Sequence, residues 1–151
     1  MVEIIHGFSP NEVVDLYRYL CIYESEMQHI GNQENLVKKY PKLQELEEKR
    51  SHFVCNYCNR ESLKVIALAP KDNLVSMTKC RSSKTLSFLH HLRNSIAHGQ
   101  LEMEDGFVHL IDYEYENNVK VFSARGKIES STLFEIIKTI INNINCHEEN
   151  I

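Results

Sequence analysis

The segment LHHLRNSIAHG, residues 89–99, organises the prediction of the fold. Its apolar residues Leu89, Leu92 and Ile96 recur at intervals of three and four, which is the spacing of the buried stripe of an α-helix. Gly99 follows this repeat at the place where a residue of left-handed conformation commonly ends a helix. The pattern predicts a helix over residues 83–98 that packs one side against a hydrophobic core.

Downstream of this helix the hydrophobic period changes to two, which is typical of β-strands. Residues 107–113 and 119–123 predict two strands, and residues 101–104 predict a short strand before them. The turn signals between the strands are Asp105-Gly106 and Asn117-Asn118. A last helix begins at Ser130 or Ser131, and its apolar repeat comprises Phe134, Ile137, Ile140, Ile141 and Ile144.

Upstream, Ser9-Pro10-Asn11-Glu12 has the composition of a capping box, with proline at the first helical position. It predicts a long helix that stops at Gly31-Asn32. Residues 41–69 predict a second helical region, which Pro70 ends. Its internal boundaries stay open at this point, and Ser62 could cap a separate short helix within it.

These elements predict a mainly α protein: an antiparallel helical bundle with a small β-meander inserted before the C-terminal helix. The 151 residues fit a single domain, residues 1–151, and 42% hydrophobic with 25% charged residues is ordinary for a globular chain. The net charge of -4 excludes a broad basic surface, so any contact with nucleic acid must be local. Neither a secretory signal nor a bilayer-spanning segment is predicted, and we expect a cytoplasmic protein that does not contact membranes.

The chain has five cysteines, an odd number that favours reduced thiols over a disulfide framework. Cys55 and Cys58 form a lone CxxC pair, which could hold zinc together with His52 or Cys80. A second cysteine pair is missing, and the surrounding apolar residues predict a helix core. Buried free cysteines are therefore the favoured interpretation, and neither a metal nor another cofactor is expected.

The polar residues of the 83–98 helix suggest chemistry. At about 100° per residue, His91, Asn94 and His98 fall together opposite the apolar stripe, with His90 beside them. Arg93 lies roughly 140° from His98, at the flank of the stripe. Arginine is a permanent cation that stabilises charge on a phosphate, and histidine transfers protons near neutral pH. The helix therefore presents a candidate catalytic face.

The order arginine, polar residue, three variable positions and histidine, here Arg93-Asn94 to His98, resembles the motif of the HEPN superfamily. The strands and the terminal helix after the motif also resemble small stand-alone prokaryotic HEPN proteins. The resemblance implies a metal-independent endoribonuclease that dimerises so that two motif helices form one cleft. It implies catalytic roles for Arg93 and His98 and an orienting role for Asn94. It further implies a toxin of a toxin–antitoxin module or an abortive-infection effector against phage.

In the expected reaction, the 2′-hydroxyl of RNA attacks the adjacent phosphate, so a metal is not needed to make a nucleophile. His98 moves the proton as acid or base, Arg93 stabilises the phosphate charge, and Asn94 holds the phosphate or the imidazole. His91 and His90 are candidate substrate contacts, or they are solvated surface residues. DNA, which lacks the 2′-hydroxyl, is not an expected substrate.

Two other interpretations stay open. His98 could interact with the dipole at the helix end while Arg93 covers apolar surface, without any catalytic role. The chain could also be a non-catalytic HEPN module that binds RNA, an antitoxin or a nucleotidyltransferase through the same helix face.

Overall fold

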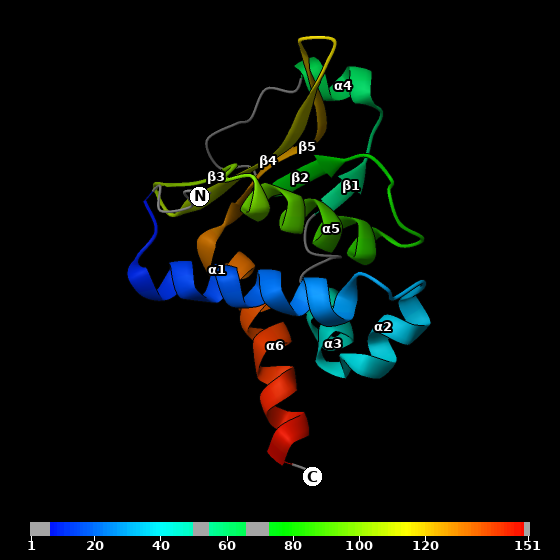
Figure 1. Cartoon of the computed structure of the whole chain (residues 1–151), viewed down its shortest axis with the longest axis vertical. Helices are drawn as coiled ribbons and strands as arrows, with labels where there is room; N and C mark the ends of the chain where they lie inside the picture. The colour runs from blue at the N-terminus through cyan, green and yellow to red at the C-terminus, as the bar shows by residue number, and fades with distance from the viewer. Residues whose placement is uncertain (1–6, 50–54, 66–72, 150–151) are drawn as a thin grey trace.

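The computed structural model describes residues 7–49, 55–65 and 73–149 and shows an α+β protein (Figure 1). The helices are α1 (Pro10–Ile22), the π-helix η1 (Tyr23–Met27), α2 (Gln33–Lys39), α3 (Pro41–Lys49), α4 (Arg60–Val65), α5 (Lys84–Ala97) and α6 (Ser130–Glu149). The strands are β1 (Cys55–Tyr57), β2 (Leu74–Met77), β3 (Leu101–Glu104), β4 (Phe107–Glu116) and β5 (Val119–Glu129).

The prediction of a helical bundle with a small meander is wrong, because the strands form a five-stranded mixed sheet in the order β1-β2-β5-β4-β3. β1 pairs with β2 in parallel, and β2 pairs with β5 in antiparallel, so the predicted meander is only part of the sheet. β1 and β2 have three and four residues, which is too short for a period of two to be distinguished from a helical pattern.

The predicted helical region 41–69 is corrected in the same way. Cys55 lies in β1 rather than in a helix, and the following helix α4 is short. Ser62 does not cap α4, because its own backbone N–H donates to the Asn59 side chain at 2.8 Å. Asn59 is therefore the residue that satisfies the first turn.

Among the other local signals, the predicted stop of the first helix at Gly31-Asn32 is wrong, because α1 ends at Ile22, η1 ends at Met27, and Asn32 caps the start of α2. The signals at the other helix ends and turns agree with the structure. Ser9 forms the predicted capping box with Glu12 at the start of α1. Ser83 caps α5 by accepting from the Leu86 N–H at 3.1 Å, and Gly99 after the helix has a φ of 65°. The turn residues also adopt positive φ, as the turn signals predicted: Asp105, Gly106, Asn117 and Asn118.

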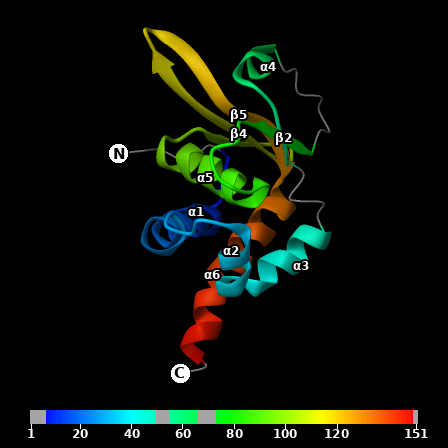
Figure 2. The ribbon, with the colours of Figure 1, turned by 90° about the vertical axis from the view of Figure 1, so that its right-hand side faces the viewer.

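Helix α5 lies between two layers. One side packs against β4, β1 and β2, and the other side packs against α1 and α2 (Figure 2). Leu89, Leu92 and Ile96, the stripe predicted to be buried, are fully buried. Because α5 is covered on two sides, only a narrow edge of the helix reaches solvent.

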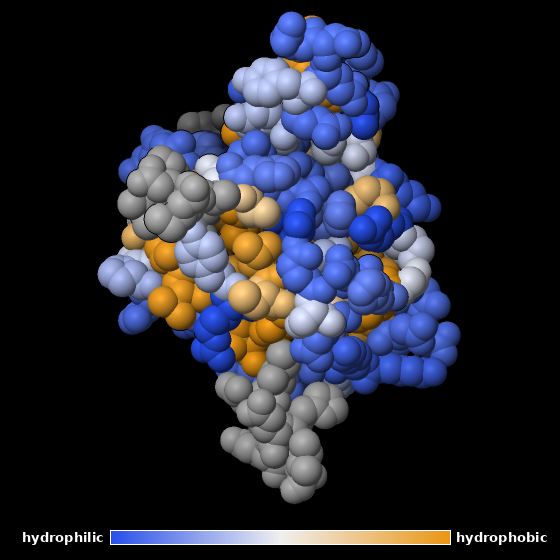
Figure 3. All heavy atoms as spheres, viewed as in Figure 1, coloured by the Kyte–Doolittle hydropathy of each residue, from blue (hydrophilic) through white to orange (hydrophobic). Residues whose placement is uncertain are grey.

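The surface differs between the two ends of the molecule. On the face shown in Figure 3, apolar side chains gather over the part that carries α1, where Val14 is 54% exposed. The end formed by the β4–β5 hairpin is mostly hydrophilic. Within the three described ranges, each helix is too short or too polar to cross a lipid bilayer.

Gly126 allows β2 and β5 to approach closely, and its replacement by alanine is expected to destabilise the sheet. An added Cβ would contact the Leu74 carbonyl and lie 2.5 Å from the Cα of Val75, both of which are backbone atoms that cannot move independently. We expect a loss of about 1–3 kcal/mol in the free energy of unfolding, measured by urea denaturation. Gly31→Ala is the matched control, because nothing lies within 4 Å of a Cβ there. Equal unfolding midpoints for the two variants would contradict this packing.

Candidate functional site

The exposed edge of α5 consists of His90, Arg93, Asn94 and Ala97, which are partly exposed, and His98, which is exposed at the helix end. These residues follow the spacing of three and four that places side chains on one side of a helix. Arg93 is partly exposed, so it belongs to this edge, on the side next to the buried stripe. We call these five residues the α5 edge.

The prediction that His91 lies on the exposed face is wrong, because its side chain is only 2% exposed. The sheet covers it, and Asp112 of β4 meets it there at 6% exposure. A helical wheel assigns a polar residue to the solvent side by default. It does not show a polar partner supplied by a strand that is remote in sequence.

His91 connects α5 to the sheet through both ring nitrogens. Nδ1 lies 2.8 Å from Asp112 Oδ2, and Nε2 lies 2.9 Å from the Thr78 carbonyl oxygen and 3.5 Å from Cys80 Sγ. Burial lowers the pKa of His91, but the hydrogen bonds to Asp112 and Cys80 outweigh it and raise the pKa to about 9. His91 is therefore a buried imidazolium that donates from both nitrogens.

His90 is neutral, whereas His91 is protonated. Its Nδ1 lies 3.1 Å from the Arg81 guanidinium and 3.1 Å from the Tyr23 hydroxyl. Because a guanidinium only donates, Nδ1 must carry the lone pair. Burial and the charge of Arg81 lower the pKa of His90 to about 4. The two adjacent histidines are thus held as one neutral ring and one cation near neutral pH.

Arg93 is held in place by an ion pair with Glu24, whose Oε1 accepts from Nε at 2.6 Å. Its Nη1 donates to Asn94 Oδ1 at 2.9 Å, and Asn94 Nδ2 donates to Asp112 Oδ2 at 3.1 Å. Arginine has five N–H groups, and within the described residues these contacts use three of them. With 29% of its side chain exposed, Arg93 can offer the remaining two to an anion.

Sequence reasoning missed Tyr23, Glu24, Arg81 and Asp112, which hold the α5 edge. Tyr23 and Glu24 belong to the π-helix η1, a rare turn that is frequent at functional sites. Glu24 is 69 residues from Arg93 in the chain, so spacing along the sequence could not connect them. In the sequence, Glu24 and Asp112 are marked only by their position next to apolar residues that recur at regular intervals.

His98 is placed differently from Arg93. It is the C-cap residue of α5, its side chain is exposed, and in the described part of the chain that side chain makes no hydrogen bond or ion pair. Positions five residues apart in an ideal α-helix differ by about 140° around the axis and about 7.5 Å along it. One protomer therefore leaves these two side chains apart, although both reach solvent.

In the CxxC pair, Cys55 begins the strand β1 and Cys58 directly follows the strand. Burial raises the pKa of Cys55 to about 12 and also raises the pKa of Cys58. His52 lies outside the described residues. Within the described residues, there is no group of three His, Cys, Asp or Glu side chains positioned to hold a metal ion.

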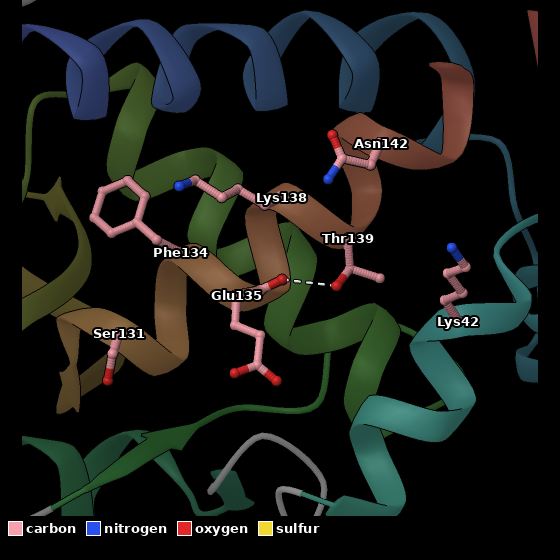
Figure 4. Close-up of a pocket in the computed structure, with 7 residues that line it drawn as sticks. All are labelled: Lys42, Ser131, Phe134, Glu135, Lys138, Thr139 and Asn142. Atoms are coloured by element: carbon pink, nitrogen blue, oxygen red, sulfur yellow. Dashed lines mark hydrogen bonds between the residues drawn. The ribbon is translucent and has the colours of Figure 1, made fainter. Parts of the chain in front are cut away.

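A hollow of about 550 Å³ lies beside α6, away from the residues predicted to act (Figure 4). Its lining comes from α6 and from Lys42 of α3, and it includes Phe134, Glu135 and Lys138. Lys138 and Lys42 are drawn at two sides of the hollow, with Thr139 between them. It contains no residue of the α5 edge.

The α5 edge is thus the part of the molecule where the sequence motif and the polar contacts coincide. Its arginine is oriented by neighbours, its histidine has no side-chain partner among the described residues, and a buried ion pair fixes the helix behind them. A scan against protein-family models, a search of curated proteins and a search of solved structures each find no match for this chain.

Proposed function

We propose that the protein is a metal-independent endoribonuclease whose catalytic residues are Arg93, Asn94 and His98. The observation that carries the proposal is their common position on the α5 edge, where solvent reaches all three. Arg93 has oriented N–H groups for a phosphate, and His98 has an exposed imidazole for proton transfer. His91 is buried and takes a supporting role instead of contacting substrate.

The chemistry needs only these side chains and the RNA itself. The 2′-hydroxyl attacks the neighbouring phosphorus, the bond from phosphorus to the 5′-oxygen breaks, and a 2′,3′-cyclic phosphate forms. His98 moves the proton between the attacking and the leaving oxygen. Arg93 binds the non-bridging oxygens and stabilises the charge of the transition state, and Asn94 keeps its guanidinium in place.

The separation of Arg93 and His98 favours a site shared by two protomers. If two copies of α5 cross in antiparallel orientation midway between residues 93 and 98, Arg93 of one protomer lies opposite His98 of the partner subunit. Ala97 sits near this crossing, and its small side chain permits a close approach. A homodimer through the α5 edge is therefore part of the proposal.

The resemblance of the motif to the HEPN superfamily supports a ribonuclease, although the helical bundle expected from that resemblance is wrong for this chain. We further propose that the enzyme acts on cytoplasmic RNA as a toxin or an antiviral effector, restrained by an antitoxin.

The test uses purified protein and two oligonucleotides of one sequence, RNA and its 2′-O-methyl counterpart, in excess EDTA. We expect cleavage of the RNA alone, with 2′,3′-cyclic phosphate ends, because methylation removes the nucleophile. Cleavage that requires an added divalent metal, or that also occurs on the methylated strand, would contradict the mechanism. Tight binding of RNA without any cleavage would favour the non-catalytic module.

A further inference from the structure

The β4–β5 hairpin extends beyond the rest of the sheet (Figure 1) and has two chemically different faces. Side chains alternate along a strand, so Tyr113 and Tyr115 share one face while Glu114 and Glu116 lie on the other. In the register of the hairpin, Tyr113 is opposite Phe122 and Tyr115 is opposite Lys120. One face is therefore aromatic and cationic, and the other carries the acids.

A β-bulge creates this arrangement. The register shifts between Asp112 and Tyr113, where Asp112 pairs with Ala124 but Tyr113 pairs with Phe122. The extra residue on β5, Ser123, moves Phe122 to the face of the tyrosines. Before the bulge Asp112 points to α5, and after it Tyr113 points to the outer face of the sheet.

The members of the aromatic face contact each other closely. The Tyr113 ring lies 5.8 Å from the Tyr115 ring and 6.0 Å from the Phe122 ring, between centroids. Lys120 Nζ lies 4.3 Å from the centroid of Tyr113, and the Arg125 guanidinium lies 4.6 Å from that of Phe122. Tyr115 is 63% exposed, which leaves most of its ring free to contact a ligand.

A cavity of about 360 Å³ continues this face toward the end of α5. Its lining begins at Gly99, the residue after His98, and ends at Tyr113 and Lys120. The Gln100 side chain shapes it by accepting from the Tyr113 N–H at 3.2 Å. Glu102 also lines the cavity, so its negative charge leaves the Lys120 end as the favourable place for an anion.

We propose that Tyr113, Tyr115 and Lys120 bind single-stranded RNA beside the cleavage position, with bases stacked on the tyrosines and a phosphate on Lys120. This inference rests on the proposed function for the identity of its ligand. Lys120 covers the Tyr113 ring in the free protein, and its flexible stem lets the ammonium turn to a phosphate and uncover the ring for a base. Stacking on aromatic rings accepts any base, so this surface gives affinity without reading a sequence.

The charge of the chain explains why such a surface is needed. A net charge of -4 gives RNA no general attraction, and a local cation beside aromatic rings compensates for that. Glu116 is also paired with Arg60 at 3.5 Å, which reduces its repulsion of a strand bound nearby.

The test measures binding of a fluorescent 2′-O-methyl oligonucleotide by fluorescence anisotropy. Its length is about 12 nucleotides, because single-strand-binding sites typically cover about 4–16 nucleotides. We expect Tyr115→Ala and Lys120→Ala each to weaken binding about tenfold, a size typical of one lost stacking or phosphate contact. Tyr115→Phe keeps the ring and should bind like the wild type. Lys38→Ala, at an exposed position of α2, is the matched control for loss of a positive charge.

The outcomes separate this inference from the proposed function. If the wild type cleaves RNA but Tyr115→Ala and Lys120→Ala bind like the control, the hairpin is not the RNA surface and the inference is wrong. The same conclusion follows if the oligonucleotide does not bind the wild type. If the two variants lose binding while the wild type cleaves no RNA, the inference stands and the ribonuclease proposal fails.

Discussion

Mixing the Arg93→Ala variant with the His98→Ala variant is expected to restore RNA cleavage that neither has alone. Each variant by itself should lose about 100-fold or more in rate, because each loses the charge-stabilising or the proton-transferring group. In a mixed dimer, Arg93 of the His98→Ala protomer meets His98 of the partner subunit, and one intact site is rebuilt. Random assembly makes half of the dimers mixed with one of two sites intact, so recovery of about a quarter of the wild-type rate is expected.

The measurement is the initial rate of cleavage after the variants are unfolded together and refolded, which lets subunits exchange. A matched control mixes two different preparations of the His98→Ala variant, where no site can be rebuilt. Absence of recovery, with dimers verified by sedimentation, would mean that the two residues act within one protomer or not at all. The shared site would then be wrong even if the wild type cleaves RNA.

Replacement of Asp112 by alanine is expected to be the most destabilising single change among the polar residues. Asp112 is 6% exposed, and its carboxylate accepts hydrogen bonds from His91 and Asn94. Its loss leaves the His91 imidazolium buried without a counter-charge, which costs about 3–5 kcal/mol. That is a large fraction of the total of about 5–15 kcal/mol that stabilises a typical domain. Glu114→Ala, on the same strand but exposed, should change the unfolding midpoint in urea only slightly.

The same pair makes stability depend on pH in a defined direction. The pKa of His91 rises from its ordinary 6.5 to about 9 on folding, so its contribution is complete below pH 6.5 and is lost as pH rises through 9. His90 has a folded pKa of about 4, so its contribution is present above pH 6.5 and lost as pH falls through 4. Urea midpoints of the wild type should therefore fall between pH 6.5 and 9. A similar fall in Asp112→Asn would show that the ion pair is not its cause.

The sequence predicted elements well where the signal lies within the element itself. The Ser9 capping box and the Gly99 helix stop each depend on neighbouring residues, and the structure confirms the helix start and the helix end that they predict. The strand β2 carries no such signal, because its four residues are stabilised by pairing with β5, which is about 50 residues away. The fold class was therefore missed at the segments whose structure is decided by remote partners.

The residues of the candidate site also differ in whether the sequence alone could identify them. The motif residues Arg93, Asn94 and His98 could be found from spacing, and their roles stay a proposal that the experiments above test. The burial of His91 could not be found, because it depends on Asp112 meeting it across the sheet. Glu24 could not be found either, because it lies 69 residues from Arg93 in the chain.

The π-helix η1 also bears on how such a site could have originated. A π turn is one residue wider than an α turn, so it is equivalent to a single inserted residue in an otherwise continuous helix. Tyr23 and Glu24 begin this turn in the register of α1, so removing one residue ahead of them, within α1, would rotate both by about 100° and separate them from His90 and Arg93. A change of one residue in the length of α1 would therefore be enough to alter the orientation of Arg93. A one-codon insertion or deletion could connect or disconnect the α5 edge without altering a residue within it.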